Sequence, residues 1–186
     1  MNKQEINQLK DAVLHFWFEE LTPEQHFKKD EDVDETIRQR FGKLHEHAVQ
    51  GECYTWRDTI EGRLAEIIVL DQFSRNMFRN SPRAFQYDPM ALVLSQEAVH
   101  LGLAHELPPH KRSFLYMPFM HSESLAIHEE AMKLFSEPGL EMNLDYEIQH
   151  KQIIERFGRY PHRNEVLNRS STKEEEAFLK EPGSSF

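Results

Sequence analysis

Three short segments of the chain concentrate the polar side chains that could bind or act on another molecule: LDQFSRNMFR at 70–79, YMPFMHSES at 116–124 and FGRYPHRN at 157–164. Imidazoles, carboxylates, amides and guanidinium groups are the types that orient small ligands and carry acid–base catalysis. We therefore take as candidate ligand-binding residues Asp71, Gln72, Arg75, Asn76, Arg79, His121, Ser122, Glu123, Arg159, His162, Arg163 and Asn164.

The arginines are unevenly distributed along the chain. Seven of the twelve lie in two windows, between Arg75 and Arg83 and between Arg156 and Arg169, and neither window contains a lysine. The planar guanidinium group suits bidentate contacts with carboxylates or phosphates, whereas lysine is a point charge. These arginines could cap helices and pair with buried acids, or they could receive an anionic ligand.

Helical periodicity indicates which way the first segment faces. Asp71 and Arg75 fall on the same helical stripe as Leu64 and Ile68, and they are i,i+4 partners. The other sides of this helix are also apolar, so we expect it to lie centrally. Charged groups on a central helix must be paired or must face a water-filled cavity.

The second segment is expected to contain a break between two helices. Pro118 should end the preceding helix, and Ser122 or Ser124 should cap the next one. His121 and His128 would then share one stripe of that helix with Phe135, facing the core.

Several kinds of site lack the spacing that they require. There is no H-E-x-x-H and no Cys/His cluster, so we predict no metal site. No G-x-S-x-G surrounds Ser74 or Ser122, and Cys53 has no basic motif nearby. A P-loop and a dinucleotide fingerprint are also missing, so we predict no cofactor.

Composition predicts a cytoplasmic protein that binds neither nucleic acid nor membranes. The net charge of −10 provides no basic footprint for phosphates or an anionic membrane surface. A single cysteine indicates a reducing compartment, and the polar N-terminus MNKQEINQLKD has no apolar signal core. A length of 186 residues favours a single domain over 1–186, with only 180–186 as a loose tail.

The elements that must position these residues are predicted to be helices. Only seven glycines are present, and apolar residues recur at helical spacing almost everywhere. We interpret the acidic run DEDVDE at 30–35 as a solvated helix start, and Thr172 with Glu175 as a capping box. The predicted helices cover about 4–19, 33–48, 59–78, 88–101, 110–117, 122–135 and 144–157, with a last one after residue 172.

Long motifs in the chain resemble a bacterial family called domain of unknown function 924. They are W-x-x-T-I-E-G-R-L-A-E-I-I-V-L-D-Q-F-S-R-N-M-F-R, A-F-Q-Y-D, F-L-Y-M-P-F-M-H-S-E-S, R-F-G-R-Y-P-H-R-N and S-T-x-E-E-x-A-F-L, with F-W-F at 16–18 and the closing Phe186. The resemblance covers essentially the whole chain. It implies an all-α, TPR-like array of antiparallel helix pairs with about eight to nine helices, and it implies no activity.

Three positions depart from the pattern of the family. Asn80 and Asn168 stand where glycine is common, and asparagine tolerates the left-handed conformation of helix ends. His128 stands where glutamine is common, so we leave it out of the candidate site.

Three functional hypotheses remain open. The candidate residues could converge on a polar pocket, in the concave side of the array, for a small anion-bearing molecule or an acidic peptide end. They could instead form a hydrolase or lyase site, with His121 or His162 as general base and Glu123 or Asp71 as its partner. Finally, they could be a buried structural network in a scaffold that binds protein partners.

Overall fold

The computed structural model describes residues 1 and 3–185, and in this part of the chain it contains helices and no strand. The prediction of an all-α fold is confirmed. The α-helices are α1 Lys3–His15, α2 Glu31–Ala48, α3 Ile60–Ile68, α4 Ser74–Met77, α5 Asp88–His100, α6 Pro109–Met120, α7 Leu125–Phe135, α8 Glu141–Phe157 and α9 Lys173–Phe178.

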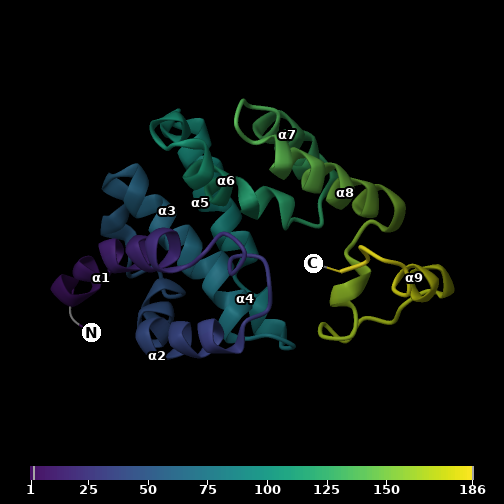
Figure 1. Ribbon diagram of the computed structural model, residues 1–186, viewed down its shortest axis with the longest axis horizontal. Helices are drawn as coiled ribbons and strands as arrows, with labels where there is room; N and C mark the ends of the chain where they lie inside the picture. The colour runs from purple at the N-terminus through teal and green to yellow at the C-terminus, as the bar shows by residue number, and fades with distance from the viewer. Residues whose placement is uncertain (2, 186) are drawn as a thin grey trace.

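Successive helices pack against one another along much of the chain. Helix α5 packs against α6, α6 against α7 and α7 against α8, while α1 and α5 both contact α3. The connections from α6 to α7 and from α7 to α8 are short, so the chain reverses direction between neighbours, as Figure 1 shows. This stacking is compatible with the TPR-like array that the resemblance implies.

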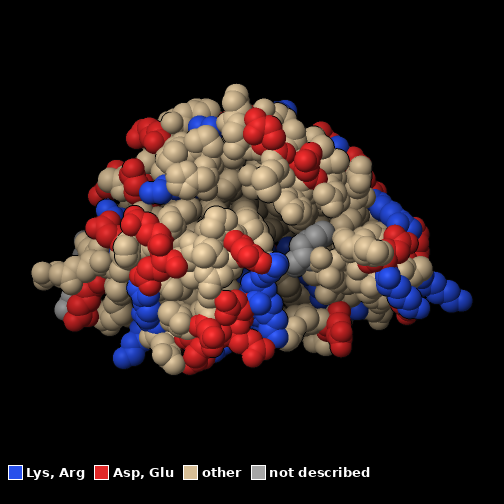
Figure 2. Space-filling model, in the orientation of Figure 1, with Lys and Arg blue, Asp and Glu red and all other residues tan. Residues whose placement is uncertain are grey.

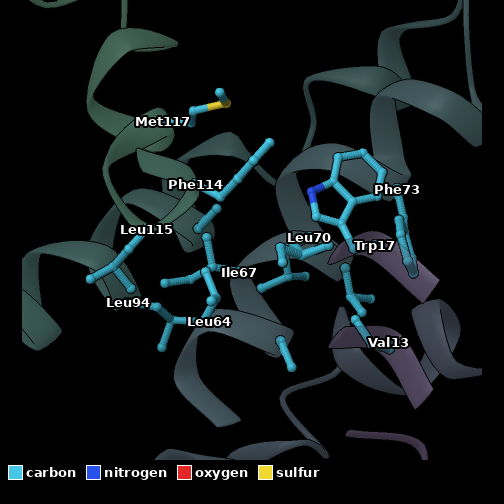
Figure 3. Close-up of a cluster of buried hydrophobic side chains, with 14 of the residues drawn as sticks. Val13, Trp17, Leu64, Ile67, Leu70, Phe73, Leu94, Phe114, Leu115 and Met117 are labelled. Carbon is cyan, nitrogen blue, oxygen red and sulfur yellow. The ribbon is translucent and has the colours of Figure 1, made fainter. Parts of the chain in front are cut away.

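A large hydrophobic cluster lies where α1, α3, α5 and α6 meet. Figure 3 shows Trp17 and Phe73 in this cluster, with Leu64 and Ile67 of α3 directed toward Leu115 of α6. A small second cluster joins the end of α8 to Tyr160 and to Phe178 of α9. Burial of these side chains supplies most of the favourable free energy of folding.

The central helix includes a π-helical turn. Helix α3 continues through the π-helical segment η3 (Val69–Phe73) into α4, which agrees with the helix predicted over 59–78. Residues 64–74 are all buried, so the prediction of a central helix is confirmed. A π turn has i→i+5 hydrogen bonds and is often found at functional sites. The candidate residues Asp71 and Gln72 lie within it.

Three predictions about the second polar segment are wrong. Pro118 does not end α6, which continues to Met120. The proline lies in the last turn, where the loss of one backbone donor disrupts little of the helix, and the backbone N–H of His121 still donates to Met117. Helix α7 begins at Leu125 rather than at 122, so His121 lies in the turn before it. No serine side chain caps α7.

Several other boundaries also differ from the sequence-based ones. The connecting loop predicted around Trp56 includes a 3-10 helix, η2, at Tyr54–Asp58. Helix α8 begins at Glu141, three residues before the predicted start. The remaining short segments are η1 Phe16–Glu20, η4 Pro82–Ala84, η5 Leu103–Glu106 and η6 Pro161–Arg163.

The predicted left-handed positions and the predicted capping box are confirmed. Asn80 and Asn168 have φ angles of 58° and 54°, in the left-handed region. Gly158 ends α8 in the same region, with φ 68°. Both halves of the capping box between Thr172 and Glu175 are present at the start of α9. In the predicted tail, the Ser184 hydroxyl is buried and donates to the carbonyl of Leu179, while Phe186 lies outside the described residues.

The face shown in Figure 2 carries acidic and basic side chains scattered among each other, without one broad basic patch. Among the described residues, no helix combines the length and the hydropathy needed to span a bilayer.

Candidate functional site

The buried carboxylate of Asp71 joins two of the three polar segments. Its Oδ1 lies 2.7 Å from His121 Nδ1 and 3.0 Å from a terminal nitrogen of Arg75, and its Oδ2 accepts a 2.7 Å hydrogen bond from Gln72. The side chain is almost fully buried, at 1% exposure. The predicted i,i+4 pair of Asp71 and Arg75 is therefore present, and it is extended by His121.

Arg75 links this carboxylate to a second one. Its two terminal nitrogens donate to the two oxygens of Asp88 at 2.8 and 2.9 Å, in the parallel geometry that is strongest for this pair. Asp88 is the first residue of α5. Arg75 is thus held between acidic residues from two helices by both of its terminal nitrogens.

Arg163 has fewer close hydrogen-bond partners than Arg75. It donates to the carbonyl of His121 at 2.9 Å, but its contact with Asp88 Oδ2 is 3.4 Å long. Its guanidinium group lies 4.5 Å from the centre of the Phe85 ring and 4.7 Å from that of Tyr160. The Nε–H is buried and has no hydrogen-bond acceptor among the described residues. Arg163 therefore keeps unused donor capacity.

The charges in this cluster shift one another's pKa. Burial raises the pKa of Asp71, but the charge of Arg75 and the contact with His121 outweigh it, so the pKa lies below its ordinary value. Burial and the charge of Arg75 lower the pKa of His121. Burial and the same neighbour lower the pKa of Arg163. At neutral pH the cluster contains ionised Asp71 and neutral His121.

A pocket of about 340 Å³ opens beside this cluster. Its polar lining comes from Gln86, from Asp88 of α5, from the turn 121–123 and from Arg163 of η6. Its apolar lining comes from the η4 region, α5, α6 and the segment after η6, and consists of Pro82, Phe85, Pro89, Leu92, Pro118 and Leu167. Four of the twelve candidate residues line it: His121, Ser122, Glu123 and Arg163.

The turn that contains His121 is held in place by hydrogen bonds from the buried side chains of His128 and Tyr160. His128 Nε2 lies 2.8 Å from the carbonyl oxygen of Ser122, and its Nδ1 lies 2.6 Å from Glu147. Burial raises the pKa of Glu147, which allows the carboxyl to hold a proton against that nitrogen. The hydroxyl of Tyr160 donates to the carbonyl of Met120 at 2.6 Å. His128 is outside the pocket lining but supports it.

Other candidate residues lie apart from the pocket lining, in paired contacts. Asn76 donates to Asp34 at 2.7 Å, and Arg79 forms two hydrogen bonds with the same carboxylate. Asp34 is buried, so the interpretation of the whole acidic run as a solvated helix start is wrong for this residue. Asp30 in that run does cap α2, accepting from the backbone N–H groups of Asp32 and Val33.

The third polar segment is held together mainly by carboxylates from outside it. Arg159 forms two hydrogen bonds with Glu175, at 2.7 and 2.8 Å. Glu123 accepts two hydrogen bonds from Arg169, and one from the backbone N–H of Tyr160 at 2.7 Å. Asn164 contacts Arg169 and Ser171. These pairs order the segment around η6, which places Arg163.

His162 is not part of the pocket lining, and burial with the charge of Arg163 lowers its pKa to about 3. Gln72 is also outside the lining, and its amide donates to Asp71 and to the sulfur of Met117. Among the described residues, no group of three His, Cys, Asp or Glu side chains is arranged to hold a metal ion.

The chain matches a known protein family over most of its length. The family described as "Bacterial protein of unknown function (DUF924)" matches residues 13–183. The chain belongs to the DUF924 family. A similar solved structure, that of a protein of unknown function from Agrobacterium tumefaciens, is 34% identical, with a TM-score of 0.89. The match covers 94% of this chain and 98% of that one. No curated protein matches the chain.

Three partners of the candidate residues were absent from the sequence-based prediction: Asp34, Asp88 and Arg169. Asp34 has a signal in the sequence, because it shares the helical stripe of Ile37, Phe41 and Leu44. Asp88 stands at a helix start beside a proline, which reads equally well as an ordinary helix beginning. Their contacts with Arg79 and Arg75 span 45 and 13 positions in the chain.

Proposed function

We propose that this protein binds a small organic carboxylate in the pocket beside Asp71. The observation that carries the proposal is the state of Arg163. It is the buried guanidinium in the pocket lining, and its nearest carboxylate, Asp88, is already held in two short contacts by Arg75. A ligand carboxylate that met Arg163 would supply the acceptor that the protein does not.

The other arginines of the polar segments support this choice by contrast. Arg75, Arg79 and Arg159 of these segments, and Arg169 just beyond the third, each form at least one contact of 3.0 Å or less with a carboxylate of the chain. Removing any of them would leave a buried or half-buried acid without its partner. We therefore propose a structural role for these four and a ligand-binding role for Arg163.

The rest of the lining indicates the body of the ligand. Apolar side chains form half of the wall, and two aromatic rings lie against the guanidinium group of Arg163, so a bound carboxylate would meet its N–H edge. A pocket of this size is at the small end of ligand sites. An aromatic or branched aliphatic acid matches these features better than inorganic phosphate, which has no apolar part.

Titration with benzoate, followed by NMR chemical shifts of the amide groups, tests the proposal. We expect shifts at residues 85–92, 118–123 and 163–167, and binding at least ~10-fold weaker in Arg163→Gln, because a charge-assisted hydrogen bond contributes about 1.5–3 kcal/mol. The matched control is Arg156→Gln, an exposed arginine of α8 that pairs with Glu174. Phosphate, sulfate and a peptide with a C-terminal carboxylate serve as competing probes.

Two results would reject this function: no shifts in the pocket with any probe, or equal affinity for benzoate in the wild type and Arg163→Gln. A response to the peptide alone would replace a small acid by a peptide end as the ligand.

A further inference from the structure

The pair of His121 and Asp71 has features that a binding pocket does not need. The imidazole lies in the pocket wall with its Nδ1 2.7 Å from a buried carboxylate, while its side chain keeps 16% exposure. No protein partner occupies Nε2 among the described residues, so the second nitrogen is available to a bound molecule. This arrangement orients an imidazole for proton transfer.

The carboxylate fixes the tautomer of the ring. Asp71 is ionised, so it can only accept, and Nδ1 of His121 must carry the hydrogen. A neutral ring then has its lone pair on Nε2. Since burial and the charge of Arg75 lower the pKa of His121, this lone pair is present at neutral pH.

The place of His121 in the pocket wall favours one use of this base. A water molecule beside Nε2 can lose its proton to the ring as it adds to a carbonyl group, because proton transfer and bond formation then proceed together. The pocket is open to solvent, which supplies this water.

We propose that His121 is the general base of a hydrolytic site, which cleaves an ester whose acid or alcohol part carries a carboxylate bound by Arg163. This inference rests on the proposed binding function and extends it to a substrate class. Asp71 is a positioning residue, and His121 is the catalytic residue.

The reaction balances with the groups present. Water adds through its oxygen to the ester carbonyl carbon and gives one proton to His121 Nε2, while the carbonyl electrons move to the oxygen. The resulting oxyanion collapses, the bond to the alcohol oxygen breaks, and the imidazolium returns its proton to that oxygen. Asp71 remains ionised and balances the charge of the imidazolium. The products are an alcohol and a carboxylic acid.

Ser122 supplies a donor for the oxyanion. Its Oγ accepts a 3.2 Å hydrogen bond from the backbone N–H of Ser124, and its own hydrogen is not donated to an acceptor among the described residues. Ser122 lines the same pocket as His121. A hydroxyl directed at developing negative charge stabilises the transition state more than the ground state.

The test uses 4-acetoxybenzoate and its neutral twin, 4-acetoxybenzamide, with release of the phenol followed by absorbance. We expect the wild type to hydrolyse the ester of 4-acetoxybenzoate. Its kcat/KM for this compound should be at least ~10-fold above that for 4-acetoxybenzamide, because Arg163 favours the anion. The variant His121→Gln keeps a donor toward Asp71, and its kcat should fall by about 10²-fold or more.

Asp71 is tested by the pH profile as well as by the rate. In the wild type, kcat should rise with pH and reach half its maximum below pH ~6.5, the ordinary pKa of histidine. The variant Asp71→Asn should lower kcat with little change in KM and move this midpoint to lower pH, since the imidazolium loses its counter-charge. A purely structural role would leave the midpoint in place. Should Asp71→Asn not fold, the wild-type profile and His121→Gln still decide.

Binding and catalysis fail in different ways in this design. Benzoate binding that survives in His121→Gln, together with ester hydrolysis that does not, supports both proposals. Benzoate binding with no hydrolysis of 4-acetoxybenzoate above buffer, or equal hydrolysis in wild type and His121→Gln, overturns the catalytic proposal and leaves the binding proposal standing. Absence of pocket shifts with every probe, or equal benzoate affinity in the wild type and Arg163→Gln, overturns the binding proposal and this inference together.

Discussion

At the scale of single residues, twelve polar side chains chosen from the sequence separate into two groups with different work. Two in the lining of the pocket, Arg163 and His121, keep donor or acceptor capacity unused by the described residues. Others, such as Arg79 and Arg159, donate hydrogen bonds to carboxylates of the chain. The sequence shows the residue types, but the number of partners each one has depends on contacts between distant segments.

The pair of Asp34 and Arg79 gives a prediction at this scale. Asp34→Asn should lower the free energy of unfolding by about 1–3 kcal/mol, because Arg79 and Asn76 lose an ionised acceptor in a largely buried place. Urea unfolding followed by circular dichroism measures it. Glu24→Gln, which removes an exposed pair with Lys28, should change stability by less than ~0.5 kcal/mol. Equal effects of the two variants would contradict the assignment.

At the scale of the elements, most helices follow from periodicity and end signals, and the exceptions have local causes. Helix α2 begins within the acidic run and α9 begins with its capping box, as the sequence indicates. Pro118 misleads because a proline in a final helical turn removes only one hydrogen bond. The start of α7 shifts because the buried side chain of His128 holds the carbonyl of Ser122 in a turn.

The left-handed asparagines provide a prediction for helix ends. Asn168→Gly should leave the free energy of unfolding unchanged or raise it by up to ~1 kcal/mol, because glycine adopts a positive φ without steric cost. Asn168→Val should lower it by about 1–2 kcal/mol, since a β-branched residue is strained there. Thermal unfolding of the two variants checks this, and a stabilising valine would contradict the backbone geometry.

The candidate site was predictable in part. Helical periodicity predicts Asp71 and Arg75 as inward-facing partners, and in the structure a terminal nitrogen of Arg75 lies 3.0 Å from Asp71 Oδ1. The position of His121 next to Asp71 was not predictable, because it depends on how the end of α6 packs over the π turn, 50 positions away. Sequence patterns report which face of a helix is buried, and they do not report what lies opposite.

At the scale of the whole molecule, several buried histidines couple folding to pH. Burial lowers the pKa of His45 to about 4, and that of His150 and His162 to about 3. Each is therefore neutral in the folded state and protonated in the unfolded state between these values and about pH 6.5. The unfolded chain binds more protons in this window, so stability falls as the pH decreases through it.

We therefore expect the free energy of unfolding to decrease from pH 7 toward pH 4, before the carboxylates of Asp71 and Glu123, whose pKa values are also lowered, are protonated. Glu147 opposes this trend, because burial raises its pKa. In His45→Gln, whose amide can still donate to Ser74, the slope between pH 6.5 and pH 4 should be smaller. Urea unfolding at several pH values measures the slope, and an unchanged slope would exclude His45 as a contributor.

The π turn within the central helix holds one residue more than an α-helical turn over the same span would. Each i→i+5 hydrogen bond encloses one residue more than an α-helical bond does. A relative that lacks one residue within 69–73 could close the same span with α-helical bonds and keep α3 and α4 against their neighbours. Asp71 would lose its direction toward His121. A single-residue gap at this point in a relative would then mark the loss of the site in an otherwise intact fold.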